Sequence, residues 1–262
     1  MDFILMGLSI LPVVVLMYFI YRQDKYQKEP IRLLALAFFG GILAIPLDFV
    51  VIDLIKKVFY SESIPYQAFL EAGFPEELSK FIVLFLLIWW RKAFDEYVDG
   101  IVYAAFLGLG FACIENIMYV AESAAQAYSA GIITSFTRAL LSVPGHFLFA
   151  VVMGYFFSLA KFDKQHRAIY LILAVICPAA IHGTFDYLLM IQDFLTPTIA
   201  TIIFVVFLWG DIKLWKLGLK FILRQQQRTR IQAINSIEER LFGASGEQPE
   251  REQIDWSAGE KR

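Results

Sequence analysis

The sequence of 262 residues is 58% hydrophobic and only 18% charged, whereas an ordinary soluble domain carries roughly a quarter charged residues. Its formal net charge of -2 shows no basic excess, which argues against nucleic acid as a partner. The composition indicates instead a protein whose solvent is the lipid bilayer.

Several apolar stretches are long enough to cross a hydrocarbon core of ~30 Å, which takes about 20 residues. In chain order they lie near residues 3–21, 32–52, 75–90, 97–121, 132–159, 168–190 and 196–217. The first has no basic n-region before it and no small-residue cleavage site after it, so it is predicted to be a span or an uncleaved anchor. We therefore expect an all-α fold, a polytopic transmembrane bundle of about seven helices.

Basic residues alternate between the connections. The connections after the first, third, fifth and last stretches hold Arg22, Lys25, Lys28, Arg32, Arg91, Lys92, Lys161, Lys164, Arg167, Lys213, Lys216, Lys220 and Arg224. The other connections are poor in basic residues, apart from Lys56 and Lys57. The positive-inside rule then predicts a multi-pass protein of the cell membrane, with its N-terminus outside and its C-terminus in the cytoplasm.

The C-terminal part of the chain differs in composition from the rest. Residues 1–219 are expected to form the transmembrane core, and residues 220–262 a cytoplasmic segment. Ile231, Ile234 and Ile237 recur at helical spacing among charged residues, which predicts an amphipathic helix. This helix lies on the inner membrane surface or, in the simpler interpretation, is solvated with a weak partner face. A disordered tail without catalytic residues is predicted after Phe242.

Ionisable side chains recur inside the predicted spans, where each costs a few kcal/mol and therefore needs a partner or a purpose. The third to sixth stretches contain Glu76, Glu77, Glu115, His146, His182 and Asp186. With the predicted orientation, all four helices place these groups in the extracytoplasmic half of the bilayer. Because this agreement in depth is not required by the helices themselves, we expect the groups to form one site.

Some of these acids also have a structural interpretation. Glu76 and Glu77 follow Pro75, and acids suit the first turn of a helix, where they complement the helix dipole. Glu76 and Lys80 are spaced as an i,i+4 ion pair. Glu115 has no such alternative, because apolar residues surround it well within a span. A functional role is therefore predicted for Glu115 from its position alone.

The remaining polar positions are an orienting pair in the sixth stretch and two charges that structural partners can explain. His182 and Asp186 stand one turn apart, so the carboxylate can orient the imidazole. Asp48 and Arg138 are weaker candidates that can be explained as partners of other charges. Gly108-Leu109-Gly110 lacks the third glycine of a phosphate loop and any preceding strand, and it predicts a close-packing helix surface.

Taken in order, these motifs resemble those of the PrsW family of membrane proteases. The motifs are Tyr21-Arg22-Gln23-Asp24 with Glu29-Pro30, Glu76-Glu77-x-x-Lys80, Asp99-Gly100 through Gly110-Phe111 to Glu115-Asn116, Pro144-Gly145-His146 and His182-x-x-x-Asp186. The family is similar in turn to the CAAX-protease and bacteriocin-processing superfamily, in which many members have histidine in the place of Glu115.

The resemblance implies a membrane-embedded endopeptidase of the bacterial cell membrane. Its substrate would be a single-span membrane protein such as an anti-sigma factor, cleaved on the extracytoplasmic side. Such a cleavage would start regulated intramembrane proteolysis and a stress response.

Hydrolysis of a peptide bond needs a base for water, a donor for the oxyanion and an acid for the leaving amine. Two carboxylates in a low dielectric do not both ionise easily, so Glu77 is predicted to act as base and to share a proton with Glu76 or, preferably, Glu115. The two histidines are expected to contact the scissile carbonyl or the water, with Asp186 holding His182 in one tautomer.

The sequence leaves the cofactor open between none and a zinc ion held by the Glu/His cluster. Glutamate and histidine are zinc ligands, but no H-E-x-x-H motif is present, which slightly favours the metal-free version. Two other functions are alternatives. A proton-coupled transporter also uses buried Glu, His and Asp, although no internal repeat or pair of broken helices is evident. In a non-catalytic scaffold the polar cluster would only fix helix packing.

Overall fold

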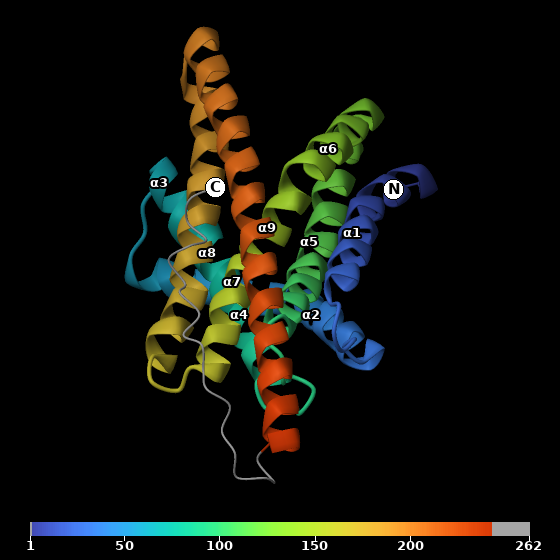
Figure 1. Ribbon diagram of the computed structural model, residues 1–262. Helices are drawn as coiled ribbons and strands as arrows, with labels where there is room; N and C mark the ends of the chain where they lie inside the picture. Colours follow the sequence, from blue (N-terminus) through green and yellow to red (C-terminus); the bar gives the residue numbers. More distant parts are fainter. Residues whose placement is uncertain (1, 243–262) are drawn as a thin grey trace.

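The computed structural model describes residues 2–242, and no β-strand occurs among them. In chain order the elements are α1 (Phe3–Gln23), α2 (Ile31–Val58), α3 (Ile64–Tyr66), η1 (Gln67–Gly73), α4 (Phe74–Ile88), α5 (Asp99–Gln126), α6 (Tyr128–Leu140), α7 (Ser142–Phe162), α8 (Arg167–Met190), η2 (Ile191–Phe194) and α9 (Pro197–Phe242). Figure 1 shows them as one helical bundle, with the N-terminus and the α8–α9 connection toward the same end. The predicted all-α bundle is confirmed.

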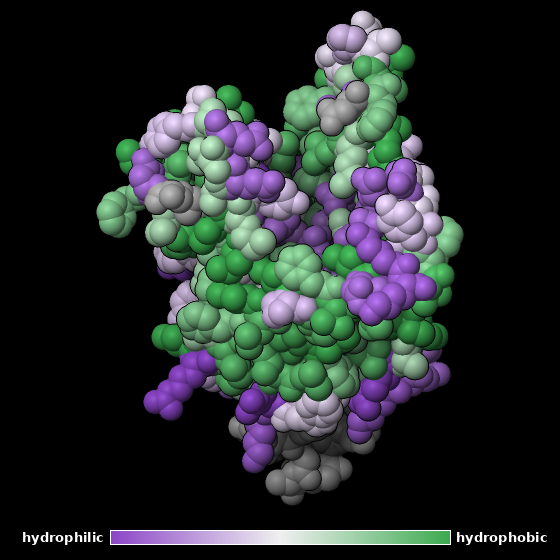
Figure 2. Space-filling view, turned by 180° about the vertical axis from the view of Figure 1, so that it is seen from behind, coloured by the Kyte–Doolittle hydropathy of each residue, from purple (hydrophilic) through white to green (hydrophobic). Residues whose placement is uncertain are grey.

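Within residues 2–242, six helical stretches are long and apolar enough to cross a membrane. Their outward faces carry large exposed apolar side chains such as Leu43, Phe49 and Val205. In the space-filling view, hydrophobic residues form a broad band across the middle of the face shown (Figure 2). Because these side chains need an apolar solvent, the chain is a multi-pass membrane protein.

Two predicted spans differ from the helices observed. The third is α4, whose 15 residues extend only ~22 Å at about 1.5 Å per residue. It continues from α3 and the π-helical η1, so the complete helical run begins earlier than predicted. The fifth span breaks at Leu141 into α6 and α7. The apolar pattern runs on through this break, and therefore the sequence does not reveal it.

Helix α5 lies at the centre of the bundle and packs against α1, α2, α6 and α7. Its contact with α2 depends on two glycines. A Cβ on Gly41 would collide with the backbone oxygen of Leu107, and a Cβ on Gly110 would collide with that of Phe38. Small residues therefore let the two backbones approach closely. This agrees with the close-packing surface predicted around Gly110.

Helix α9 is continuous over 46 residues, so the predicted amphipathic segment extends the last span without a break. Beyond the span it packs on the end of α1 and on the α4–α5 connection. The Gln226 side-chain amide donates to the Gln23 carbonyl at 2.6 Å, and the Thr229 hydroxyl accepts from the Val98 backbone N–H at 3.2 Å. The division at residues 219 and 220 remains a prediction, and the predicted tail after Phe242 lies outside the described residues.

Candidate active site

The fold brings all of the predicted site residues together. Glu76 and Glu77 occupy the first turn of α4, Glu115 lies in α5, His146 lies near the start of α7, and His182 and Asp186 lie in α8. Glu77 and both histidines are buried. Contacts between these helices join all of the residues into one network.

A close helix contact sets the distance between α4 and α8 in this network. A Cβ on Gly73, the last residue of η1, would lie 2.6 Å from the backbone nitrogen of Gly183, and a Cβ on Gly183 would overlap the ring of Phe69. Since Gly183 follows His182 directly, this contact brings His182 beside the first turn of α4. The π-helical geometry of η1 precedes the two glutamates, and such segments are frequent at functional sites.

The Lys80 ammonium lies in the middle of the cluster. Its Nζ is 2.8 Å from Oε1 of Glu77, 3.1 Å from Oε2 of Glu76 and 3.1 Å from Nδ1 of His146. On another side it lies 4.1 Å from the centre of the Phe111 ring. The i,i+4 pair with Glu76 predicted from the sequence is thus present, but it is only one of several contacts of this lysine.

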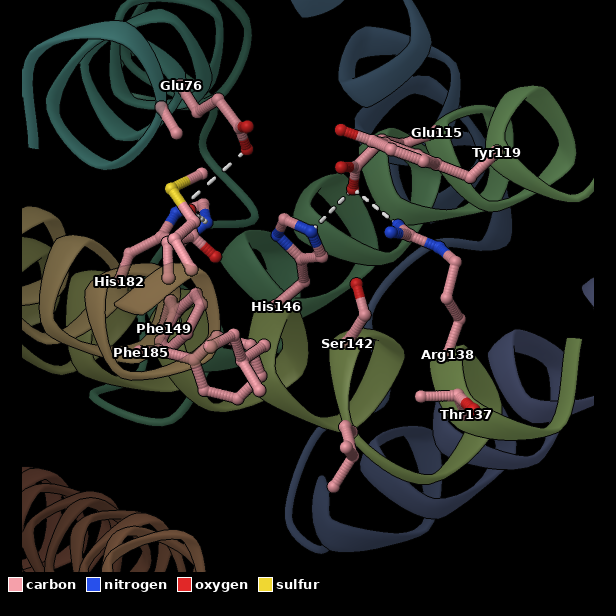
Figure 3. Close-up of a pocket in the computed structure, with 15 residues that line it drawn as sticks. Glu76, Glu115, Tyr119, Thr137, Arg138, Ser142, His146, Phe149, His182 and Phe185 are labelled. Atoms are coloured by element: carbon pink, nitrogen blue, oxygen red, sulfur yellow. Dashed lines mark hydrogen bonds and ion pairs between the residues drawn. The ribbon is translucent and has the colours of Figure 1, made fainter. Parts of the chain in front are cut away.

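His146 connects Lys80 with Glu115. Because an ammonium group can only donate, Nδ1 of His146 accepts from Lys80 and its Nε2 carries the proton. Nε2 then donates to Oε2 of Glu115 at 2.6 Å (Figure 3). The imidazole is therefore held in one tautomer from both sides.

His182 has a carboxylate at each of its ring nitrogens. Its Nδ1 lies 3.0 Å from Oε1 of Glu77, and its Nε2 lies 3.3 Å from Oδ2 of Asp186. Phe149 stacks on the ring with 4.6 Å between centroids, which fixes its plane. Asp186 thus stands where it can hold the tautomer of His182, the role predicted from the one-turn spacing.

Arg138 of α6 completes the surroundings of Glu115. Its Nη2 lies 3.0 Å from Oε2 of Glu115, and its Nε donates to Oδ1 of Asn116 at 3.0 Å. Asn116 in turn donates to the Ser9 carbonyl of α1 at 2.7 Å, and the guanidinium lies over the ring of Tyr119. The expected direct pairing of Glu77 with Glu115 is not what the structure shows, because each carboxylate has separate partners.

A cavity of about 280 Å³ opens beside this cluster. Glu76, Glu115, Arg138, His146 and His182 line it together with apolar side chains, whereas Glu77 lies behind it, fully buried. In Figure 3 the polar side chains point toward the cavity from different helices. In Figure 2 the end of the molecule is hollowed between two arms, with hydrophilic side chains inside. Water and a peptide group can thus reach the histidines and Glu76.

The donor atoms suit a metal ion. Glu76, Glu77, His146 and His182 each offer one ligand atom, and these atoms lie within 4.8 Å of one another. Oε2 of Glu77 is buried without a hydrogen-bond partner among the described residues, and an unpaired carboxylate oxygen is available to bind a cation. Two imidazoles and carboxylates form a ligand set typical of catalytic zinc. The residues present therefore fit such an ion.

Two charged residues contact the site more extensively than their sequence pattern indicates. The spacing predicts only an ion pair with Glu76 for Lys80, and for Arg138 only a pairing with other charges. The signal that identifies Lys80 is the cost of placing a charge within a span, which applies to it as it does to Glu115.

Comparison with known proteins agrees with this geometry. Residues 29–210 match the family model described as PrsW family intramembrane metalloprotease. Protease PrsW of Clostridioides difficile is 40% identical over 209 residues, covering 77% of this chain and 85% of the relative. Protease PrsW of Bacillus subtilis is 34% identical over 213 residues, covering 79% and 91%. No solved structure matches the chain. The helices, the site and these relatives show that the chain is a membrane protease, not a transporter or a scaffold, and that it belongs to the PrsW family.

Proposed function

We propose that this protease cleaves a single-span membrane protein, such as an anti-sigma factor, on its extracytoplasmic side and so starts regulated intramembrane proteolysis. The observation that carries the proposal is the position of the cavity. It lies in the half of the bundle that contains the start of α1, since Asn116 beside Glu115 bonds to Ser9. The alternating loop charges assign that half to the outside.

The site contains the groups that peptide hydrolysis requires. We assign Glu77, His146 and His182 as holders of a zinc ion, and Glu76, which lines the cavity, as the base. The zinc ion would activate a water molecule and polarise the scissile carbonyl. This assignment replaces the slight preference for a metal-free site, because four donors converge and the family is described as metalloproteases.

Glu115 and Asp186 orient the two histidines that we assign as holders of the zinc ion. Glu115 accepts from Nε2 of His146, and Asp186 lies 3.3 Å from Nε2 of His182, which leaves the Nδ1 atoms directed toward the centre of the cluster. Such outer carboxylates fix the tautomer and raise the basicity of the ligand. Arg138 orients Glu115 and presents a cation at the edge of the cavity, where negative charge develops on the carbonyl oxygen.

The test is cleavage of purified single-span substrates by the full chain in proteoliposomes. Wild type should release the extracytoplasmic part of the substrate, and Glu77→Gln should lose at least about a hundredfold in rate. Glu122→Gln, on the exposed surface of α5, is the matched control and should cleave like wild type. Cleavage within the cytoplasmic part, or normal cleavage by Glu77→Gln, would contradict the proposal.

A further inference from the structure

Lys80 occupies the place that the donor geometry assigns to a metal. Its Nζ contacts three of the four donor residues, at 3.1 Å from Glu76, 2.8 Å from Glu77 and 3.1 Å from His146. The fourth, His182, joins through Glu77. The Lys80 side chain is only 2% exposed, so no water layer separates the ammonium from these donors.

One cluster of this size has room for one cation. The donor atoms lie within 4.8 Å of one another, and the ammonium uses the lone pairs that a metal would use. Two cations that share these donors in a low dielectric would also repel each other strongly. A zinc ion can therefore bind only if the Lys80 ammonium leaves the centre.

Asp48 of α2 provides a destination for this ammonium. The residue is 6% exposed, and its Oδ1 has no hydrogen-bond partner among the described residues. An unpaired carboxylate at membrane depth is costly, so a cation beside Asp48 would stabilise it.

The packing of α2 on α4 fixes the depth of Asp48 in the bundle relative to Lys80. Lys56 near the end of α2 forms a 3.1 Å ion pair with Glu71, just before α4. Earlier in α2, Gly40 lies against the side chain of Val83, in the second half of α4. The two helices thus run antiparallel. Asp48 lies halfway between Gly40 and Lys56, which places it level with the turn that contains Glu76 and Lys80.

We propose that Lys80 is a cation with two positions. Without metal its ammonium holds the glutamates and His146 together, and when zinc binds it moves to Asp48. In both states the buried acids of the donor cluster face a cation, and in the zinc-bound state Asp48 gains one as well. The inference rests on the zinc site of the proposed function, and it predicts that zinc affinity depends on Lys80 and Asp48 as a pair.

The experiment is a double-mutant cycle on the full chain in detergent, with zinc affinity measured by competition against a fluorescent chelator. Lys80→Met keeps the side-chain volume and removes the competing charge, and should bind zinc about tenfold more tightly. Asp48→Asn removes the destination and should bind zinc about tenfold more weakly. The double variant should bind zinc as tightly as Lys80→Met, because Asp48 affects zinc affinity only by accepting the displaced Lys80 ammonium. Asp53→Asn, exposed on the same helix, is the control and should bind like wild type.

Thermal unfolding gives a second readout that does not depend on cleavage. Metal-free Lys80→Met should unfold at a lower temperature than wild type, and zinc should raise its midpoint by more than it raises that of wild type. If Lys80→Met does not fold even with zinc, Lys80→Gln takes its place in the same cycle.

Each result that departs from these expectations overturns a different part of the proposal. Unchanged or weaker zinc binding by the Lys80 variants overturns the competition between lysine and metal. A loss from Asp48→Asn that is equally large in the Lys80→Met background overturns the movement of Lys80 to Asp48. If active wild type binds no zinc, the zinc assignment of the proposed function fails and the inference falls with it.

Discussion

Glu115 holds the outer nitrogen of His146 from a different helix, with Oε2 at 2.6 Å from Nε2. Asp186 does the same for His182 from within one helix, at 3.3 Å. Both imidazoles therefore have a carboxylate on one side and the cluster centre on the other. The two histidine motifs lie far apart in the sequence. In both of them an outer carboxylate orients an imidazole toward the centre of the cluster.

This arrangement predicts that Glu115→Gln and Asp186→Asn each lower zinc affinity by about 10- to 100-fold, with a matching loss of cleavage. The amides keep the size of the acids but not their charge. Zinc binding by chelator competition and substrate cleavage should be measured on the same preparations, with Glu122→Gln as control. If Glu115→Gln bound zinc normally but did not cleave, Glu115 would itself transfer the proton, as the sequence suggested.

Glu76 and Glu77 are neighbours that should behave differently. Glu76 lines the cavity, whereas Glu77 is fully buried behind it. We expect Glu76→Gln to keep zinc affinity and lose about 10²- to 10⁴-fold in cleavage rate, because it removes the base. Glu77→Gln should lose both zinc and cleavage. Equal loss of zinc in both variants would show that both glutamates are ligands.

Arg138 should be sensitive to the shape of its side chain as well as to its charge. Its guanidinium contacts Glu115 and Asn116 and lies over Tyr119, which a lysine ammonium cannot do at once. Arg138→Gln and Arg138→Lys should each slow cleavage by roughly 10- to 100-fold, measured as kcat with a soluble peptide substrate. Full activity of Arg138→Lys would show that only the charge is needed.

Stability should fall with rising pH because of Glu29 in the α1–α2 connection. Burial raises the pKa of Glu29 to about 7, from 4.5 for the unfolded chain. The folded state then binds more protons between these values, so the free energy of unfolding decreases as pH rises from about 4.5 to 7, by roughly 2–3 kcal/mol. Glu29→Gln removes the contribution of Glu29 to this slope, because its amide does not titrate.

The measurement is thermal unfolding in detergent at pH 5.5 and 8. Glu29→Gln should be more stable than wild type at pH 8, and the difference should be clearly smaller at pH 5.5. Glu62→Gln, in the exposed α2–α3 connection, should show the wild-type slope. A slope in Glu29→Gln that is as steep as in wild type would assign the pH dependence to other groups.

The orientation can be tested independently of the site. In a cysteine-free background, Glu62→Cys should react with a membrane-impermeant maleimide from outside intact cells. Lys25→Cys should react only after lysis, because the basic connections face the cytoplasm. Both positions are exposed, so reactivity reports sidedness. Labelling of Lys25→Cys in intact cells would invert the orientation and with it the proposed side of cleavage.

The sequence by itself determined the long helices and predicted which polar residues the fold brings into one cluster. Hydropathy reports directly how much apolar surface a segment offers to lipid, so the long spans emerge without any knowledge of packing. Glu115 could be identified in the same way, because a charge within a span is costly wherever its partners come from. The family could also be predicted, since its motifs combine residue types with fixed spacing, and the matches confirm it.

Only the tertiary structure decided which partner each polar group has. Lys80 was assigned to Glu76 by its spacing, yet it also contacts Glu77 and His146. Likewise, the pairing of Glu115 with His146 depends on how α5 crosses α7, which no periodicity along one helix encodes. The physical reason is that a sequence pattern fixes the face and depth of a side chain. The helix crossings, which are set by small residues such as Gly41 and by side-chain shape, fix the neighbours.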